Sequence, residues 1–161
     1  MTLAASGGTL EDDPMAARAL IIEARFYDDI ADMLLEGARA EFAKRRFESD
    51  VISVPGVLEI APALAMALTS ARRRDLPYSV FAVLGCVIRG ETYHFEIVAN
   101  EGNRAVVDLQ VANRLALGNG ILTVENREQA VLRADPRKKD KGGDAAAAAI
   151  ALYDLREALN R

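Results

Sequence analysis

The sequence contains only one cysteine and one histidine, and this scarcity excludes two kinds of site. A single cysteine, Cys86, cannot form an intramolecular disulfide, which is typical of a reducing compartment. Because Cys86 lies within the apolar run from Val80 to Ile88, we interpret it as a small buried hydrophobe rather than a nucleophile. One histidine and one cysteine cannot supply a zinc-type ligand set, so we expect no metal.

The sequence also lacks a long apolar run and an excess of positive charge. No run approaches the roughly 20 apolar residues of a membrane span, and the first residues lack the basic start and apolar core of a signal peptide. The formal net charge of −4 argues against nucleic-acid binding through phosphate neutralisation. We therefore expect a cytoplasmic protein that binds neither membranes nor nucleic acid. The basic run 137–139, followed by Lys141, is interpreted as a solvated loop.

The chain has 161 residues, of which 51% are apolar, so it can bury the core of a single domain. Residues 1–18 are rich in alanine, glycine, serine and aspartate. This composition predicts a flexible N-terminal tail that orders only against a neighbour. The predicted domain then covers residues 19–161.

Apolar runs alternate with segments of helical periodicity along this domain. The runs 19–23, 50–54, 80–88 and 118–123 predict four buried strands. Ile30, Leu34, Ala38 and Phe42 recur every four residues and predict the first helix, over 28–47, with Asp28 or Asp29 as its cap. Further helices are expected over 58–71, 93–115 and 126–134, the last with a capping box, and after 142–143. Strands that are apolar on both faces indicate a doubly wound parallel sheet with helices on both sides.

Ligands of such sheets bind beyond the carboxyl ends of the strands. The segments at this edge are 25–26, 55–59, 89–94 and 123–126. In 89–94, Gly90 permits a tight turn and Thr92 is a good N-cap residue, so the start of the next helix can bind an anion. Taken alone, this segment is more often an ordinary strand-to-helix loop.

Five side chains near this edge have a functional and a plain structural interpretation. His94 could transfer protons, although a structural histidine at the edge of the core is the commoner case. Arg133 could grip a phosphate with Lys141, or cap its own helix while the lysine stays solvated. Phe26 could stack on a heterocycle or belong to the core. Glu59 could accept hydrogen bonds from ligand hydroxyls or complement a helix dipole.

The order and spacing of these motifs resemble the 6,7-dimethyl-8-ribityllumazine synthase family. The most specific motif is Arg-Gly-x-Thr-x-His after the third predicted strand. The resemblance covers about residue 19 to the end, and the segments that carry it are 24–26, 54–60, 84–95, 120–125, 128–130, Arg133 and 141–142. It implies a flavodoxin-like three-layer sandwich with a four-stranded parallel sheet flanked by helices.

The resemblance also implies a transferase reaction in riboflavin biosynthesis. Family members condense 5-amino-6-(D-ribitylamino)uracil with 3,4-dihydroxy-2-butanone 4-phosphate, and release 6,7-dimethyl-8-ribityllumazine, phosphate and water, without a cofactor. Two alternatives stay open: a non-catalytic paralogue that binds flavin or lumazine, and a scaffold whose assembly matters more than its chemistry. Riboflavin synthase, which would consume the product, is a candidate downstream partner.

The resemblance assigns roles to individual residues. His94 would move protons, and Arg133 of an adjacent subunit would grip the phosphate, with Lys141 nearby. Phe26 would stack on the pyrimidine ring, and Glu59 would bind the ribityl hydroxyls. The other implied substrate-binding residues are Val57 and Leu58 at the ribityl chain, Cys86, Val87 and Ile88 at the pyrimidine edge, Glu91 and Thr92 at the phosphate, and Asn119 at the ring.

The family assembles as pentamers with the site between neighbours, and some pentamers associate further into decamers or shells. Four positions depart from the family pattern. Asn119 and Leu58 replace frequent aromatic residues, which thins the apolar surroundings of the ring. Lys139-Asp140 replaces a usual Gly-Asn pair, in a loop that bears on how pentamers associate. We therefore expect an isolated pentamer.

Overall fold

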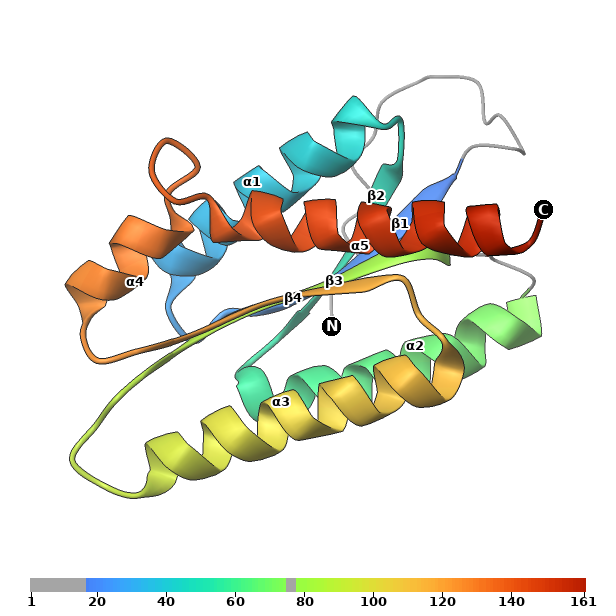
Figure 1. Ribbon diagram of the computed structural model, residues 1–161. Helices are drawn as coiled ribbons and strands as arrows, with labels where there is room; N and C mark the ends of the chain where they lie inside the picture. Colours follow the sequence, from blue (N-terminus) through green and yellow to red (C-terminus); the bar gives the residue numbers. More distant parts are fainter. Residues whose placement is uncertain (1–16, 75–77) are drawn as a thin grey trace.

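The computed structural model describes residues 17–74 and 78–161 (Figure 1). Strands and helices alternate along these residues. The strands are β1 (Arg18–Ala24), β2 (Glu48–Val54), β3 (Tyr78–Ile88) and β4 (Leu117–Val124). The α-helices are α1 (Asp28–Lys44), α2 (Ile60–Arg74), α3 (His94–Asn113), α4 (Arg127–Ala134) and α5 (Lys141–Leu159), with a 3-10 turn η1 (Val57–Glu59) before α2. Residues 1–16 of the predicted tail lie outside the described part of the chain.

The four strands form one parallel sheet in the order β2-β1-β3-β4. In the centre, Ile22 pairs with Ile52 on one side and with Val83 on the other. The order is that of the flavodoxin-like fold, as predicted, and it reverses direction between β1 and β3. Such a switch point leaves a crevice beyond the carboxyl ends of those two strands.

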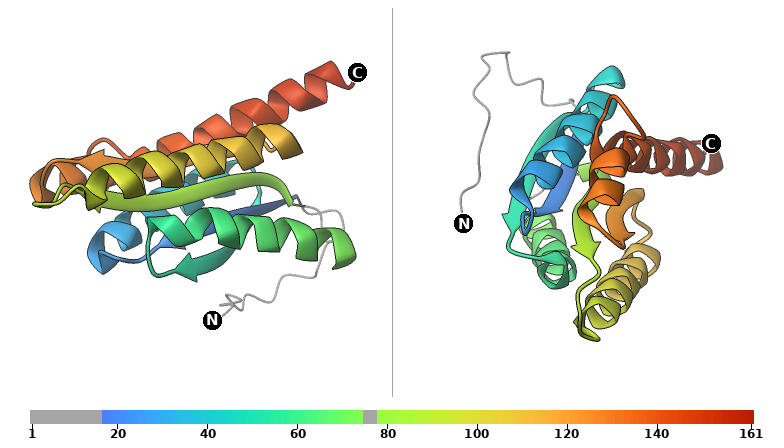
Figure 2. Two further views of the ribbon diagram at one scale, coloured as in Figure 1. Left: turned by 90° about the horizontal axis from the view of Figure 1, so that it is seen from below. Right: turned by 90° about the vertical axis from the view of Figure 1, so that its left-hand side faces the viewer.

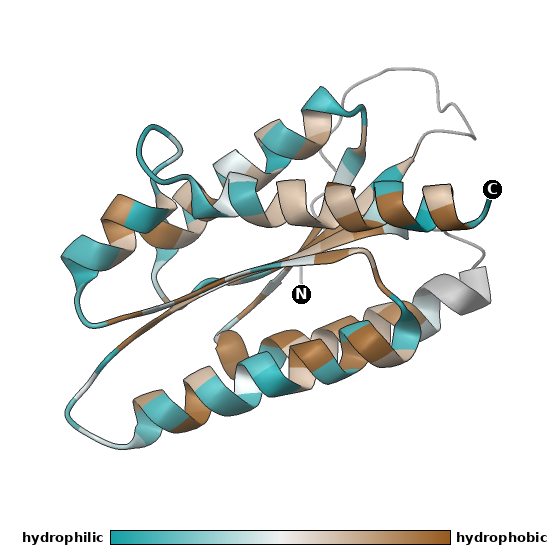
Figure 3. Ribbon diagram, in the orientation of Figure 1, coloured by the Kyte–Doolittle hydropathy of each residue, from teal (hydrophilic) through white to brown (hydrophobic). Residues whose placement is uncertain are grey.

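Helices cover both faces of the sheet, so the molecule has three layers (Figures 1 and 2). One face packs against α1, α4 and α5, and the other against η1, α2 and α3. The central strands β1 and β3 are hydrophobic along most of their length (Figure 3), because parallel strands covered on both sides bury both sets of side chains. Among the described residues, no helix is long and apolar enough to span a membrane.

The first predicted helix is confirmed, but its predicted cap is wrong. Ile30, Leu34, Ala38 and Phe42 are all fully buried along α1. The N-cap residue is Tyr27, and no side chain caps the helix start. The predicted start of α4 is confirmed, because the side chain of Asn126 accepts a hydrogen bond from the backbone of Gln129 at 2.9 Å. The return bond of the capping box differs: the Gln129 side chain accepts from the backbone N–H of Glu125 at 2.9 Å instead of that of Asn126.

The last helix begins earlier than predicted. We expected it after Gly142-Gly143, with Lys141 in a loop, whereas Lys141 is the first residue of α5. Asp140 caps this start by accepting a hydrogen bond from the backbone N–H of Gly143 at 3.1 Å. A Cβ atom at Gly142 would overlap the carbonyl oxygen of Leu34, so this glycine lets α5 cross α1 closely. A Cβ atom at Gly143 would instead overlap the capping carboxylate of Asp140.

Candidate active site

A pocket of about 510 Å³ lies beyond the carboxyl ends of the strands, where the strand order reverses. It opens between the loop after β1, the turn after β2, the end of β3 and the start of α3. Three of the four segments predicted at this edge contribute to it. The lining residues are Phe26, Tyr27, Pro55, Gly56, Val57, Leu58, Glu59, Cys86, Val87, Ile88, Gly90, Thr92, His94, Phe95 and Val98.

The fourth segment, 123–126, does not line this pocket. Four of the predicted site residues are also absent from its walls: Glu91, Asn119, Arg133 and Lys141. The chain therefore brings together the residues assigned to the ribityl chain and proton transfer, and those assigned to the pyrimidine except Asn119. It leaves apart Arg133 and Lys141, which were assigned to an adjacent subunit.

Phe26 forms one wall of the pocket with most of its ring in solvent. Its side chain is 73% exposed, which argues against a core role. The ring packs edge-on against Tyr27, with centroids 5.0 Å apart. One open face of an aromatic ring beside an apolar pocket is suited to stacking on a flat heterocycle.

Cys86 forms part of the pocket floor at the end of β3, between strands of the buried sheet. It is 7% exposed, and burial raises the pKa of its thiol to about 12. The buried, uncharged interpretation from the sequence is therefore confirmed. A protonated thiol is a poor nucleophile, so Cys86 shapes the pocket rather than attacking a substrate.

The raised pKa of Cys86 predicts a loss of stability in alkali. The folded state binds the thiol proton more tightly than the unfolded chain does, so this contribution is complete below the ordinary thiol pKa of 9.0. It is lost as the pH rises from there toward about 12. We expect the free energy of unfolding in urea to decline above pH 9, and to decline less steeply in Cys86→Ala. Burial also raises the pKa of Tyr78, to about 12, and that of Tyr27, so both tyrosines contribute to the decline that remains.

The loop between β3 and α3 is held by Arg89, which the sequence analysis did not assign to the site. The guanidinium donates to Glu125 at 2.8 Å, just after β4, and to Glu96 in the first turn of α3. It also lies 4.5 Å from the centroid of the Phe95 ring. Arg89 thus ties two strand ends to the helix that begins at His94.

His94 and Thr92 lie in this braced loop at the pocket mouth. Both residues are exposed. His94 is therefore not a structural histidine at the edge of the core. Thr92 is not the N-cap, which is Tyr93. Its hydroxyl oxygen instead accepts a hydrogen bond from the backbone N–H of His94 at 3.4 Å. The imidazole is free to reach a substrate in the pocket.

Asn119, Lys141 and Arg133 lie away from the pocket, whereas Glu91 stands between two residues that line it. Asn119 and Lys141 line a shallow hollow between β4 and α5, together with Asp144, which pairs with the lysine at 3.0 Å. The Asn119 side-chain amide donates to Asn103 at 2.9 Å, so it is held on the surface of this hollow.

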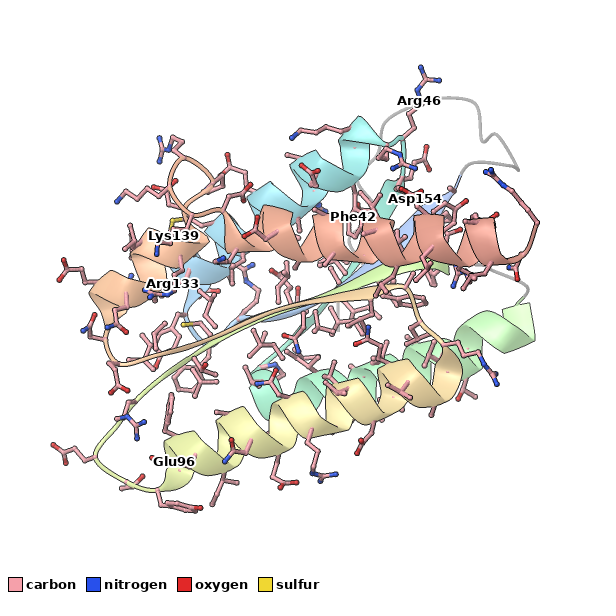
Figure 4. All side chains as sticks on the ribbon, viewed as in Figure 1. Phe42, Arg46, Glu96, Arg133, Lys139 and Asp154 are labelled. Carbon is pink, nitrogen blue, oxygen red and sulfur yellow. The ribbon has the colours of Figure 1, made fainter. Side chains whose placement is uncertain are left out.

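Arg133 lies in the last turn of α4, on the opposite side of the sheet from Glu96 and α3 but at the same end of the molecule (Figure 4). Its guanidinium donates to the carbonyl oxygen of Gln129 at 3.1 Å. Within one chain the side chain therefore bonds back to its own helix one turn earlier, and it does not cap the last carbonyl groups of α4. This bond uses one of five N–H donors, which leaves most of the guanidinium for an anion.

Known proteins of one family match the chain over most of its length. A family model described as 6,7-dimethyl-8-ribityllumazine synthase matches residues 16–157. A protein of that name from Rhodopseudomonas palustris (strain BisA53) is 54% identical over 143 residues, covering 89% of this chain and 88% of that protein. Another from Agrobacterium fabrum (strain C58) is 56% identical over 140 residues, with 87% and 95% covered. These matches agree with the resemblance carried by the sequence motifs.

Proposed function

Because the chain belongs to the 6,7-dimethyl-8-ribityllumazine synthase family, we propose that its pocket is one half of an active site that a second subunit completes. The protein is a transferase of riboflavin biosynthesis. It condenses 5-amino-6-(D-ribitylamino)uracil with 3,4-dihydroxy-2-butanone 4-phosphate to give 6,7-dimethyl-8-ribityllumazine, phosphate and water. The observation that carries the two-subunit site is the division of the site residues between the pocket and a separate region formed by α4, the edge strand β4 and α5.

In this proposal the pocket holds the pyrimidine substrate. Phe26 stacks on the ring, and the backbone of 86–88 contacts the polar edge of the ring. The ribityl chain extends along Val57 and Leu58 toward Glu59, whose carboxylate accepts hydrogen bonds from its hydroxyl groups. Glu59 is exposed at the start of α2, where a carboxylate can bind hydroxyls without a large desolvation cost.

The butanone phosphate binds at the other end of the pocket. The backbone N–H groups at Glu91 and Thr92 precede α3, and the start of a helix favours a phosphate through its free donors and its dipole. His94 then transfers protons during imine formation and phosphate elimination. Most of the rate gain comes from holding two reactants together, which needs no cofactor.

Arg133, Lys141 and Asn119 reach this pocket from an adjacent subunit of a homopentamer. Two features of the described chain support such an assembly. None of the three lines the pocket of its own chain, and several large apolar side chains are exposed on the outer faces of the helices, as is typical of protein interfaces. Those on α2 and α3 are Met66, Ile97, Val107 and Val111, which are 45–72% exposed.

The pentamer is not expected to build a larger shell. Lys139 and Asp140 replace the usual Gly-Asn pair, and Asp140 adopts a left-handed backbone, with φ of 45°, at the start of α5. This loop differs from the pattern of the family at a position that bears on contacts between pentamers. The proposed compartment is the cytoplasm, and riboflavin synthase is the proposed partner that takes up the product.

The function is tested by mixing the purified protein with both substrates and following lumazine by absorbance and fluorescence. We expect many turnovers per subunit. We also expect the molecular mass of the assembly in solution to equal that of five chains. Tight riboflavin binding with no turnover would instead support the non-catalytic paralogue, which the names of the curated relatives do not favour. An active monomer would refute the shared site but not the reaction.

His94→Ala is expected to lower kcat about a hundredfold, because general acid–base catalysis typically contributes 10²–10⁴-fold. The side chain is exposed, so the variant should fold normally and keep the KM of both substrates. Added imidazole should restore part of the rate by occupying the vacated space. A variant with wild-type kcat would show that protons move through another group or through water.

A further inference from the structure

We infer that Arg25, Glu23 and Ser53 form a network that positions Phe26 for stacking on the pyrimidine substrate. This inference rests on the proposed function and extends it to three residues outside the pocket wall. Arg25 is the residue before Phe26, and Glu23 lies two residues earlier in β1. They are positioning residues, because their effect on the substrate passes through the aromatic ring.

Glu23 is a buried charge at the carboxyl end of a central strand. Its side chain is 2% exposed, and a carboxylate at such a place is costly unless charged and polar partners satisfy it. Arg25 supplies two hydrogen bonds, to the two carboxylate oxygens, at 2.9 and 3.1 Å. The Ser53 hydroxyl donates a third from the neighbouring strand at 2.7 Å. Both Arg25 bonds come from one guanidinium nitrogen, so the carboxylate is held by this nitrogen and the Ser53 hydroxyl while the other two nitrogens stay available.

The rest of the Arg25 guanidinium is bonded to α1. It donates to the Asp28 carboxylate at 3.0 Å, to the Asp28 carbonyl oxygen at 3.2 Å and to Asp32 at 2.5 Å. All three nitrogens of the fork are thus occupied, and one side chain joins β1 to the first two turns of α1. Only residues 25–27 separate these elements. The start of α1 has no side-chain cap. Its position is fixed instead by the bonds from Arg25 to Asp28 and Asp32.

Phe26 has little else to hold it. With 73% of its surface in solvent, it has an edge contact with Tyr27 as its one ring contact among the described residues. The backbone is fixed on the other side by a hydrogen bond from the Arg25 N–H to the Val54 carbonyl oxygen at 2.9 Å. An exposed ring on a short connection binds well only if the connection is already ordered, since ordering it during binding weakens affinity. The buried ion pair provides that order.

The test is Arg25→Lys, which keeps the positive charge but loses the planar fork. We expect the KM for the pyrimidine substrate to rise about tenfold, since small misplacements of binding groups have effects of this size or larger. The kcat value and the KM for butanone phosphate should change less than twofold, because stacking contributes equally in the ground and transition states. Arg45→Lys is the matched control: Arg45 pairs with Asp154 through two hydrogen bonds at the other end of α1, and we expect unchanged kinetics.

A double-mutant cycle with Phe26→Ala separates positioning from general stability. If Arg25 acts through the ring, Arg25→Lys should have no further effect on KM once the ring is gone. The same tenfold rise in the Phe26→Ala background would overturn the inference. Ser53→Ala, which deletes one hydrogen bond to Glu23 and leaves the ion pair, is a second variant in case Arg25→Lys does not fold. We expect its KM for the pyrimidine substrate to rise about threefold, and an unchanged value would also overturn the inference.

The positioning role of Arg25 and the proposed reaction can be refuted separately. Wild-type protein that forms no lumazine would refute both, because the positioning role needs the reaction. Active wild-type protein together with unchanged KM in Arg25→Lys would refute the positioning role alone.

Discussion

Arg133→Ala is expected to lower kcat/KM about a thousandfold, the loss typical of removing a charged donor from a preorganised anion site. The truncated side chain is half-buried on α4, and in the single chain its only hydrogen bond is to the carbonyl oxygen of Gln129 among the residues described. The variant should therefore fold and assemble. Most of the effect should be seen at subsaturating butanone phosphate, and steady-state kinetics with each substrate varied in turn would measure it. Arg133→Lys keeps the charge without the fork and should recover part of the rate.

The position of Arg133 adds a second, sharper test. On one chain it lies across the sheet from α3 (Figure 4), whereas His94 begins α3 and lines the pocket. If sites form between subunits, refolding Arg133→Ala together with His94→Ala should create sites in which both halves are intact. In a random equal mixture of a ring with head-to-tail contacts, about a quarter of the sites meet this condition. Activity should rise well above that of either variant alone. No recovery, with refolded wild-type protein active, would show that both residues serve the same subunit's site.

The sequence predicted which segments form the pocket better than it predicted the side-chain networks that hold these segments in place. Apolar runs located the four strands, and the spacing of apolar residues located the buried face of α1, because burial on a regular helix repeats at a fixed interval. The rule that ligands bind beyond the carboxyl ends of parallel strands then placed 25–26, 55–59 and 89–94 together. These are general consequences of the fold. A single residue such as Phe26 is predicted to belong to the site because it follows the end of a strand.

The networks around Arg25 and Arg89 could not be predicted in the same way. Glu23 and Ser53 are 30 residues apart, and Arg89 and Glu125 are 36 apart. No local period connects such partners, and their pairing depends on strand order. The sequence did carry one signal, because the charged residue Glu23 follows four apolar residues inside β1. The cap predicted for α1 was wrong for a related reason: Asp28 bonds to Arg25 instead of to its own helix.

The largest loss of stability is expected from adding a single methyl group at Gly118. A Cβ atom there would overlap the carbonyl oxygen of Ala145 in α5. The two segments that would collide are both regular backbone. Gly118 pairs with Ala82 inside the sheet, and Ala145 lies in the second turn of α5. Neither can move like the end of a flexible side chain, so Gly118→Ala must separate β4 from α5. We expect a loss of about 3 kcal/mol or more in the free energy of unfolding. The melting temperature should fall by about 10 °C for a domain of this size.

Gly90→Ala is the matched control for this effect. The same methyl group meets no atom within 4 Å at Gly90, and its φ is not in the left-handed region. Its free energy of unfolding should stay within about 0.5 kcal/mol of wild type. Urea unfolding of both variants beside wild-type protein measures the difference. Equal stability of the two variants would mean that α5 can shift away from β4 at little cost. The close packing of α5 on the sheet would then not be what fixes Lys141 and the hollow beside Asn119, and the residues proposed to complete a neighbouring pocket would lack a rigid support.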